Sequence, residues 1–281
     1  MNETATAKVQ VTKINAGQAD VAVDFLACEE PLEIRLIHGN EKSRVKNSVS
    51  VTMRTPGNDA ELAIGFLFTE GIIRSKNELK GYENTTGNIV EISLAENVHP
   101  GLQKLDRNFY TTSSCGVCGK ASLDAIKTIE APSAEKGKIT VSPEVLYSLP
   151  ALLRKTQQVF EQTGGLHAAA VFDTLGNLVL VREDVGRHNA LDKLIGNCFL
   201  NDRLPLSGHI LLLSGRASFE LIQKAVMAGI RIVVAVGAPS SLAVELAKEF
   251  DMTLAGFLRD NRFNIYCGKK RIKGGSASFS I

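Results

Sequence analysis

The second half of the chain alternates between strand-like and helix-like segments, and this alternation constrains the fold more than any other feature of the sequence. Short apolar runs typical of strands occur at 166–172, 178–182, 209–213, 231–236 and 253–257. Helical patterns lie among them at about 187–197, 217–228 and 240–250. Repeated strand–helix units predict an α/β fold in which a partly parallel sheet is layered with helices.

The first part of the chain predicts a smaller α+β unit. Residues 20–37 and 47–54 alternate apolar and polar side chains, which indicates a hairpin-rich start whose strands have one buried face. A helix that covers this first sheet is expected to begin at an Asn58 or Asp59 cap and to end at Gly71. Further short strands are expected at 88–94 and 108–112.

We therefore expect two domains, and an α+β fold for the chain as a whole. The first comprises residues 1–130 and the second residues 138–281, because Pro132, Gly137 and mixed charges interrupt the periodicity between them. The second domain is predicted to open with a helical region that Ser142 caps and that ends at Gly164-Gly165.

Charge and hydropathy exclude several classes of protein. Among 281 residues, 32 Lys and Arg against 30 Asp and Glu leave a formal charge of +2, too little to indicate a dedicated nucleic-acid binder. No apolar stretch is long enough for a membrane span, and the first residues lack the apolar core of a signal peptide. The cytoplasm is the expected location, with no membrane partner.

Cys115-Gly116-Val117-Cys118 is the pattern with most chemical content. It is predicted to lie in a loop ahead of a helix, where the helix dipole and Lys120 favour thiolate over thiol. Such a thiolate acts as a nucleophile, a redox partner or a metal ligand, and the spacing alone does not choose among them. The other cysteines, Cys28, Cys198 and Cys267, are isolated and are expected to be small buried hydrophobic residues.

A metal site and a disulfide-exchange site are the alternatives, and the sequence lacks a feature that each of them requires. A structural zinc site needs two further ligands, and no second close pair exists. A deaminase-type zinc site needs a glutamate two residues after its histidine, but Ala169 follows His167 at that distance. A thioredoxin-like exchanger expects a compact βαβ unit, whereas this motif lies between the two predicted domains. We therefore expect no bound metal.

Four segments in this order resemble the FdhD family of formate dehydrogenase accessory sulfurtransferases. They are C-G-V-C-G-K-A-S, G-G-L-H-A-A-A, E-D-V-G-R-H-N-A-L-D-K-L-I-G and L-S-G-R-A-S-F-E, and the resemblance extends from about residue 45 to 267. It implies a dimer whose second domain is cytidine-deaminase-like. It also implies that the protein takes persulfide sulfur from a cysteine desulfurase and passes it to the molybdenum bis-guanine-dinucleotide cofactor of formate dehydrogenase. On this resemblance Cys115 carries the persulfide and Cys118 assists. The alternative is a chaperone that binds the cofactor without handling sulfur.

An anionic cofactor needs local positive groups, and two strand-to-helix turns supply candidates. Ser214-Gly215-Arg216 follows one apolar strand and Gly237-Ala238-Pro239-Ser240 follows another, so each turn presents helix amides to a phosphate. Arg216 adds a bidentate donor.

The polar segment around residue 187 is a further candidate. His188 and Asp192 are four residues apart, as are Asn189 and Lys193, so side-chain pairs within the helix, including an ion pair, are expected. The resemblance implies that Arg187, His188 and the strand residue His167 belong to the site, but it gives none of them a role.

The turn Phe257-Leu258-Arg259-Asp260-Asn261-Arg262 joins two predicted strands. Arg259 and Arg262 are placed to bracket phosphates, and Phe257 to stack on a guanine. In the family the matching segment is taken as cofactor-binding. The basic residues 269–273 are expected to be a solvated end.

Overall fold

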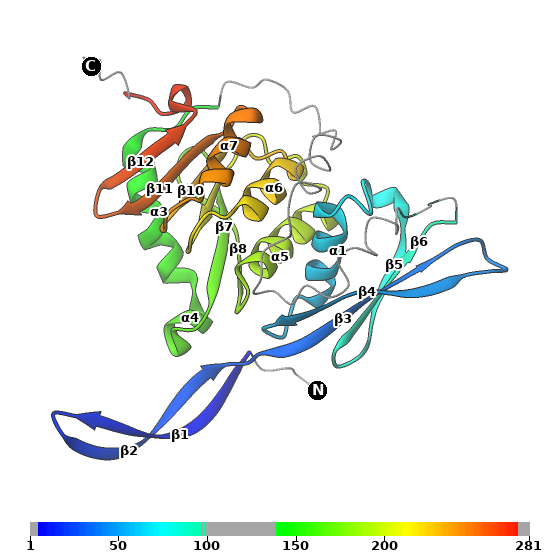
Figure 1. Ribbon diagram of the computed structural model, residues 1–281, viewed down its shortest axis with the longest axis horizontal. Helices are drawn as coiled ribbons and strands as arrows, with labels where there is room; N and C mark the ends of the chain where they lie inside the picture. Colours follow the sequence, from blue (N-terminus) through cyan, green and yellow to red (C-terminus); the bar gives the residue numbers. More distant parts are fainter. Residues whose placement is uncertain (1–4, 97, 99, 101–138, 275–281) are drawn as a thin grey trace.

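The computed structural model describes residues 5–96, 98, 100 and 139–274, and its larger unit is built on a six-stranded sheet (Figure 1). The strands are β7 (His167–Phe172), β8 (Leu178–Asp184), β9 (Ile210–Leu213), β10 (Ile232–Ala235), β11 (Thr253–Arg259) and β12 (Arg262–Cys267), in the order β12-β11-β10-β9-β7-β8. Strands β9, β10 and β11 are parallel, and the other neighbours are antiparallel. The predicted α/β class and the partly parallel sheet are confirmed.

Helices cover both faces of this sheet because its side chains alternate between two cores. The helices are α3 (Pro143–Thr156), α4 (Gln158–Thr163), α5 (Arg187–Leu200), α6 (Phe219–Met227) and α7 (Ser241–Glu249). Ala168, Ala170 and Phe172 of β7 share one core with the leucines of α3. Ala169 and Val171 share the other core with α5, α6 and α7. A period of two along a strand is what places consecutive residues on opposite faces.

In the part of the chain that the structure describes, the smaller unit is a four-stranded sheet with one helix. Its elements are β3 (Glu30–His38), β4 (Val45–Arg54), α1 (Asp59–Thr69), the 3₁₀ turn η1 (Lys76–Glu78), β5 (Leu79–Thr86) and β6 (Ile89–Leu94), with the strand order β4-β3-β6-β5. The predicted strand region 20–37 contains two strands, and the prediction missed β5 and the strand Thr6–Asn15. The predicted strand at 108–112, the linker and the Cys115–Cys118 motif lie outside the described residues.

Helix α1 begins where the sequence predicts, but without the predicted cap. Asn58 occupies the N-cap position with φ 59° and makes no side-chain cap hydrogen bond. Asp59 is instead held by the fully buried Arg54, whose Nε and Nη2 donate to its two carboxylate oxygens at 3.0 and 2.8 Å. This bidentate pair fixes the strand-to-helix turn at the start of α1.

One hydrophobic core connects the two units, because α1 packs directly against α5. Leu62 and Leu67 of α1 share this core with Leu191 of α5 and with the inner face of the four-stranded sheet. The helices approach closely because glycine lies at their crossing: a Cβ at Gly65 would meet the backbone of Asp192, and one at Gly196 that of Glu61. Two glycines thus set the distance between the helices.

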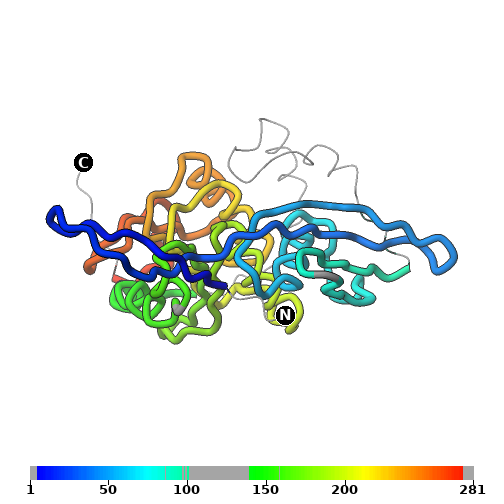
Figure 2. Tube along the Cα trace, turned by 90° about the horizontal axis from the view of Figure 1, so that it is seen from below, coloured from blue at the N-terminus to red at the C-terminus, as the bar shows by residue number. Residues whose placement is uncertain are grey.

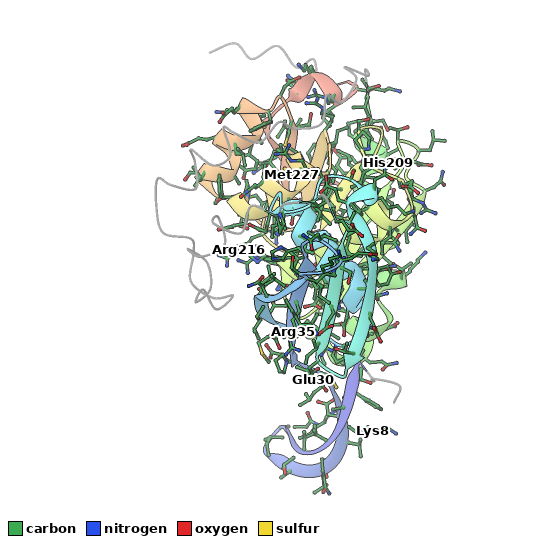
Figure 3. The ribbon with its side chains drawn as sticks, turned by 90° about the vertical axis from the view of Figure 1, so that its right-hand side faces the viewer. Lys8, Glu30, Arg35, His209, Arg216 and Met227 are labelled. Atoms are coloured by element: carbon green, nitrogen blue, oxygen red, sulfur yellow. The ribbon has the colours of Figure 1, made fainter. Side chains whose placement is uncertain are left out.

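Strands β1 (Thr6–Asn15) and β2 (Gln18–Ala27) form a separate two-stranded hairpin, which we call the arm. The arm extends away from the six-stranded unit, and it lies end to end with the β3–β4 hairpin along the long axis of the molecule (Figures 1 and 2). Ile14, Val21 and Val23 on the arm are 62–69% exposed. Lys8 lies on the same arm (Figure 3).

The basic segment near the end of the described chain is not the solvated end that was predicted. Residues Lys269–Arg271 form the 3₁₀ turn η3, in which Arg271 is buried and donates to Asp251 at 2.8 Å. Ile272 enters the core beside α3. The apolar residue within the basic run is what draws this segment onto the sheet. No helix among the described residues is long and apolar enough to cross a membrane.

Candidate functional site

Sheet topology gathers the predicted site residues of the second unit at one edge. The parallel strands β9, β10 and β11 all end there. Because β7 and β12 are antiparallel to their neighbours, they begin there, at His167 and Arg262. Strand β8 ends there, and α5 follows with Arg187 and His188. Ligands of open α/β sheets bind at the carboxyl ends of parallel strands, so this edge is the candidate site.

Backbone hydrogen bonds hold the three strand-end turns side by side. Gly237 N–H donates to the Gly215 oxygen at 3.0 Å, and Phe257 N–H donates to the Gly237 oxygen at 3.1 Å. A Cβ at Gly237 would lie 3.0 Å from the Arg216 nitrogen, so a side chain there would press the neighbouring turns apart. The edge is therefore preorganised by its backbone.

The serines of these turns differ in what they do. Ser240 caps α7, since its hydroxyl accepts from Ala243 N–H at 3.2 Å. Ser214 Oγ accepts from Ala168 N–H at 2.8 Å, which ties β9 to β7. Ser218 is the N-cap residue of α6 without a side-chain cap bond.

A pocket of about 760 Å³ opens at this edge and contains four of the predicted residues. His167, Ser214, Arg259 and Asp260 line it, together with residues of α3, α4 and the segments beside them: Pro150, Leu153, Arg154, Phe160, Gly164, Gly165, Leu166 and Val236. The other predicted residues lie at the same edge without lining this pocket. Arg216, among them, is exposed (Figure 3).

The turn that carries Arg259 and Asp260 is a tight hairpin. Asp260 and Asn261 have φ of 49° and 59°, the positive values that both central residues of a type I′ turn require. Arg259 and Arg262 are paired across it. Neither arginine forms an ion pair with a described residue, so both guanidinium groups remain available to an anion.

Phe257 and Leu258 occupy different environments. Phe257 is 38% exposed with φ 57°, next to an irregularity in the β11–β12 register. Leu258 is 1% exposed and belongs to the core beneath α3, so its side chain anchors the turn and is not available to a ligand.

His167 is held in a partly desolvated position against Gly215. A Cβ at Gly215 would lie 3.2 Å from the imidazole Nδ1, so any larger residue there would have to displace the ring slightly. Burial, followed by the charges of Arg187 and His188, lowers the pKa of His167, while Asp184 opposes the shift. The neutral imidazole is therefore the form present at neutral pH.

The E-D-V-G-R-H-N segment divides between structure and site, and the side-chain pairs predicted within its helix are wrong. Lys193 Nζ lies 2.7 Å from the buried Asp184 and donates to the Thr55 oxygen at 2.8 Å. Asp192 pairs with Lys224 at 3.0 Å. Both pairs are buried, because the first unit and α6 cover α5 on these sides. Asp184 comes from the end of β8 and Lys224 from α6.

His188, which was expected to pair with Asp192, faces α6. Its Nε2 lies 3.4 Å from Ser218 Oγ and 3.8 Å from Glu220. The contact with His188, together with smaller contributions from the Glu220 backbone N–H and Ser218, lowers the pKa of Glu220 to about 2, against the opposing effect of burial. Close by, Arg187 Nε is buried without a hydrogen-bond partner among the described residues.

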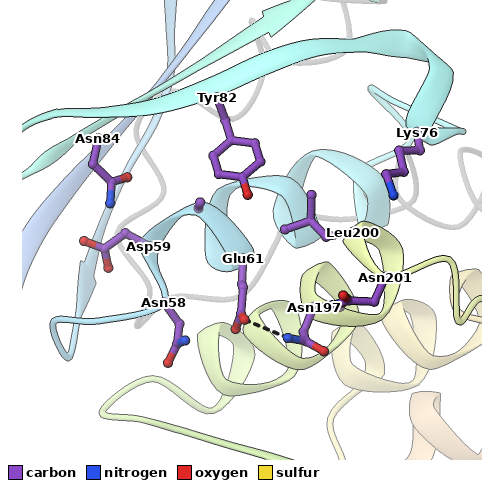
Figure 4. A pocket seen from close by; sticks show the side chains of 10 residues that line it. Asn58, Asp59, Glu61, Lys76, Tyr82, Asn84, Asn197, Leu200 and Asn201 are labelled. Carbon is purple, nitrogen blue, oxygen red and sulfur yellow. Dashed lines mark hydrogen bonds between the residues drawn. The ribbon is translucent and has the colours of Figure 1, made fainter.

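A second cavity, of about 530 Å³, lies between the two units and contains none of the predicted residues (Figure 4). Tyr82, Asn84 and Lys76 face Glu61 and Asn197 across it, and Asn197 Nδ2 donates to Glu61 at 2.8 Å. In residues 5–96 and 139–274, no group of three or more His, Cys, Asp or Glu side chains is arranged to hold a metal ion. Because Cys115 and Cys118 are outside these ranges, the expectation of no bound metal stays a prediction.

Residues 27–273 match the model of the FdhD/NarQ family. The chain belongs to this family. It is 50% identical over 277 residues to the sulfur carrier protein FdhD of Streptomyces coelicolor, covering 95% of both chains. It is 43% identical over 265 residues to the sulfur carrier protein FdhD of Sulfurisphaera tokodaii, covering 94% of this chain and 98% of that one.

A solved structure confirms the fold at the level of the whole chain. It is described as the crystal structure of a "putative formate dehydrogenase accessory protein" from Desulfotalea psychrophila, and it matches with a TM-score of 0.73 at 23% identity. The match covers 96% of this chain and 100% of that one.

In this FdhD/NarQ family chain, the pocket wall formed by α3 and α4 was missed by sequence reasoning. The guanidinium of Arg154 lies 4.7 Å from the centre of the Phe160 ring, a cation–π contact that bridges the break between the two helices. Glu183 of β8 accepts from Phe160 N–H at 3.1 Å and so fixes the start of α4. The only local signal was the Gly164-Gly165 stop, which says nothing about which strand end the helices face.

Proposed function

We propose that the chain is a sulfur carrier that takes persulfide sulfur from a cysteine desulfurase and transfers it to the molybdenum bis-guanine-dinucleotide cofactor, in support of formate dehydrogenase. The observation that carries this proposal is the pocket at the carboxyl edge of β9–β11, which combines His167, an unpaired Arg259 and apolar walls. Such a pocket suits a nucleotide, since phosphates meet the guanidinium and the base meets apolar surface. Membership of a family whose relatives are named sulfur carrier proteins supports the sulfur chemistry.

In the proposed reaction, Cys115 carries the sulfur. Its thiolate attacks the terminal sulfur of a desulfurase persulfide, the bond between the two donor sulfurs breaks, and the donor cysteine leaves as a thiolate. Cys118 then attacks Cys115 Sγ, so that a Cys115–Cys118 disulfide forms and hydrosulfide is released toward the cofactor. The two thiols supply the two electrons that reduce the transferred sulfur.

The cofactor is the substrate of this transfer, and the structure offers positive groups for its phosphates. Arg259 lines the pocket, Arg262 is its cross-turn neighbour, and Arg216 lies on the turn after β9. Helix α5, which begins with Arg187 and His188, and helix α6 both have their amino termini at this edge.

We propose that the protein works as a homodimer in the cytoplasm, where thiols stay reduced. The arm supports the dimer. It pairs with no third strand among the described residues, and isolated two-stranded hairpins are marginally stable in water. A second copy of the chain would cover its exposed valines.

Sulfur loading is tested by intact mass after incubation with a cysteine desulfurase and cysteine. Wild type gains sulfur, Cys115→Ala does not, and Cys118→Ala is the matched variant of the same motif that retains the loading site. A gain in Cys115→Ala with the sulfur on Cys118 would reverse the roles of the two cysteines. If neither thiol gains sulfur and the cofactor still binds, the protein is a cofactor chaperone.

Nucleotide binding is tested by calorimetry with GDP as a fragment of the cofactor. Arg259→Ala and Arg262→Ala should each lose a charge-assisted contact worth about 1.5–3 kcal/mol, or roughly tenfold or more in Kd. Arg74→Ala is the control, because Arg74 lies on the first unit outside the pocket. Unchanged affinities in folded variants would remove the turn from the site.

A further inference from the structure

Thr55 belongs to the first unit, but its backbone and hydroxyl groups all bond to the junction of β8 and α5 in the second. It directly follows β4 and is 3% exposed. Its N–H donates to Asp184 Oδ2 at 3.1 Å, and its hydroxyl oxygen accepts from Val185 N–H at 3.1 Å. Its carbonyl oxygen accepts from Lys193 Nζ at 2.8 Å. One buried residue of the first unit therefore bonds to both the strand end and the helix of this junction.

The start of α5 depends on these contacts because it has no cap of its own. Gly186 is the N-cap residue and has no side chain to accept from the helix amides. The Asp184 carboxylate instead accepts from Gly186 N–H at 2.8 Å and from Asn189 Nδ2 at 3.1 Å. Asn189 Nδ2 also donates to the Met53 oxygen of β4 at 2.8 Å. The first turn of α5 is thus held by Asp184 and by the first unit.

The two residues that this junction presents at the carboxyl edge have few contacts of their own. Arg187 forms no side-chain hydrogen bond with a described residue, and its buried Nε is left without a partner there. The polar contacts of His188 among the described residues are with Ser218 and Glu220 of α6. Both Arg187 and His188 lie close enough to His167 for their charges to lower its pKa. A shift of the junction would therefore move both side chains relative to His167.

We propose that Thr55 is a positioning residue for the cofactor site, because it fixes the junction from which Arg187 and His188 reach the edge of the sheet. The inference rests on the proposed binding of the cofactor's nucleotide at this edge. Thr55 acts through the β8–α5 junction and does not contact the ligand. Every cofactor-binding residue predicted from the sequence lies in the second unit, so the first unit completes a site to which it contributes no ligand contact.

The hydroxyl of Thr55 is tested with two substitutions that have opposite expected results. Valine has nearly the shape of threonine but cannot accept a hydrogen bond, so Thr55→Val leaves Val185 N–H without its partner. Thr55→Ser retains the hydroxyl. Calorimetry with GDP should show about tenfold weaker binding for Thr55→Val, comparable to the loss of one charge-assisted contact, and affinity within about twofold of wild type for Thr55→Ser.

Thr69→Val is the matched control, because it makes the same change elsewhere in the joint between the units. Thr69 is 1% exposed, and its hydroxyl lies in the buried network that joins α1, α5 and α6. This variant should be less stable toward urea but should bind GDP as tightly as wild type. Asn189→Ala removes the contacts of Asn189 with β4, so it should weaken GDP binding as Thr55→Val does. It replaces Thr55→Val in the test if that variant does not fold.

A double-mutant cycle separates positioning from a general loosening of the protein. In the background Arg187→Ala, His188→Ala, the side chains through which Thr55 acts are gone. There Thr55→Val should weaken GDP binding by less than about twofold, because the positioning effect has nothing left to act on.

The results that overturn the inference differ from those that overturn the proposed function. Wild-type affinity in folded Thr55→Val, an equal loss in Thr55→Ser or in Thr69→Val, or an effect of Thr55→Val that persists in full without Arg187 and His188 would each overturn the inference while leaving the GDP site in place. Absence of GDP binding to wild type would overturn the nucleotide part of the proposed function together with this inference.

Discussion

At the scale of single residues, adjacent members of one polar segment do different work. Lys193 and Asp184 are almost completely buried and join the two units, whereas His188 is partly exposed and faces Glu220. Asp184 ends strand β8, whereas His188 and Lys193 are five positions apart on α5, so their side chains point about 140° apart. The His188–Glu220 contact is accessible to solvent, so a change of pH can alter the protonation of Glu220.

The pKa of Glu220 makes a prediction for acid stability. Because the folded pKa, about 2, lies below the ordinary value of 4.5, the contacts of the ionised Glu220 carboxylate, with His188 the largest, stabilise the fold above pH 4.5. That stability is lost as the pH falls from 4.5 toward 2. We expect His188→Ala to lower the free energy of unfolding at pH 5 and to have much less effect near pH 2, as measured by urea unfolding.

The matched control for this acid effect is Glu220→Gln. In that background, His188→Ala should produce no pH-dependent difference over the same range, since the titrating carboxyl is gone. The same acid dependence with Glu220 removed would show that another group is responsible.

At the scale of elements, the decisive contact is the crossing of α1 and α5. The first unit contributes α1 and the second contributes α5, and the glycines at their crossing bring the two backbones together. Near this crossing, Thr69 of α1 donates to Asp192 at 2.9 Å, and Lys224 of α6 donates to Thr69 at 2.9 Å. The joint between the units is thus made of close backbone packing and a buried polar network.

Gly65→Ala should destabilise the protein, although Ala in place of Gly within a helix usually stabilises by about 0.5–1 kcal/mol. The new methyl would meet the backbone of α5, which cannot move aside as a side chain can, so a net loss of about 1–3 kcal/mol is expected. Gly208→Ala is the control, because a Cβ there meets nothing within 4 Å. Urea unfolding measures both, and a Gly65→Ala protein as stable as wild type would contradict the close crossing.

At the scale of the whole molecule, the arm contacts α4 through β2 but leaves an apolar face exposed. Val21 and Val23 lie on one face of it, opposite Thr12 and Gln10, and are 69% and 62% exposed. An apolar face of this kind on a projecting hairpin is typical of an interaction surface.

Replacing these valines should therefore dissociate the proposed dimer. We expect wild type to sediment as a dimer and the double variant Val21→Asp, Val23→Asp to sediment as a monomer with unchanged circular dichroism, because charge on the arm opposes burial. Leu175→Asp is the control, since Leu175 is 77% exposed in the turn between β7 and β8. A double variant that remains dimeric would place the interface elsewhere.

The sequence by itself determined the elements whose signals are local. Short apolar runs predicted β7 to β11, Ser142 with Pro143 predicted the start of α3, and Gly71 the stop after α1; each matches the structure. The reason is that backbone preference and side-chain periodicity act between neighbours in the chain. Strand β5 was missed because Leu79–Thr86 is mostly polar and lies at a sheet edge, where one-sided burial leaves little pattern.

The tertiary structure alone decided which of these local pieces meet. Lys193 and Asp192 find partners on other elements in place of their helix neighbours, and Arg154 and Phe160 are brought opposite Arg259 and Asp260 across the pocket. These placements depend on strand order and on the packing of α3 and α5 against opposite faces of the sheet. Many weak, non-local contacts set that packing together, so no short stretch of sequence contains it.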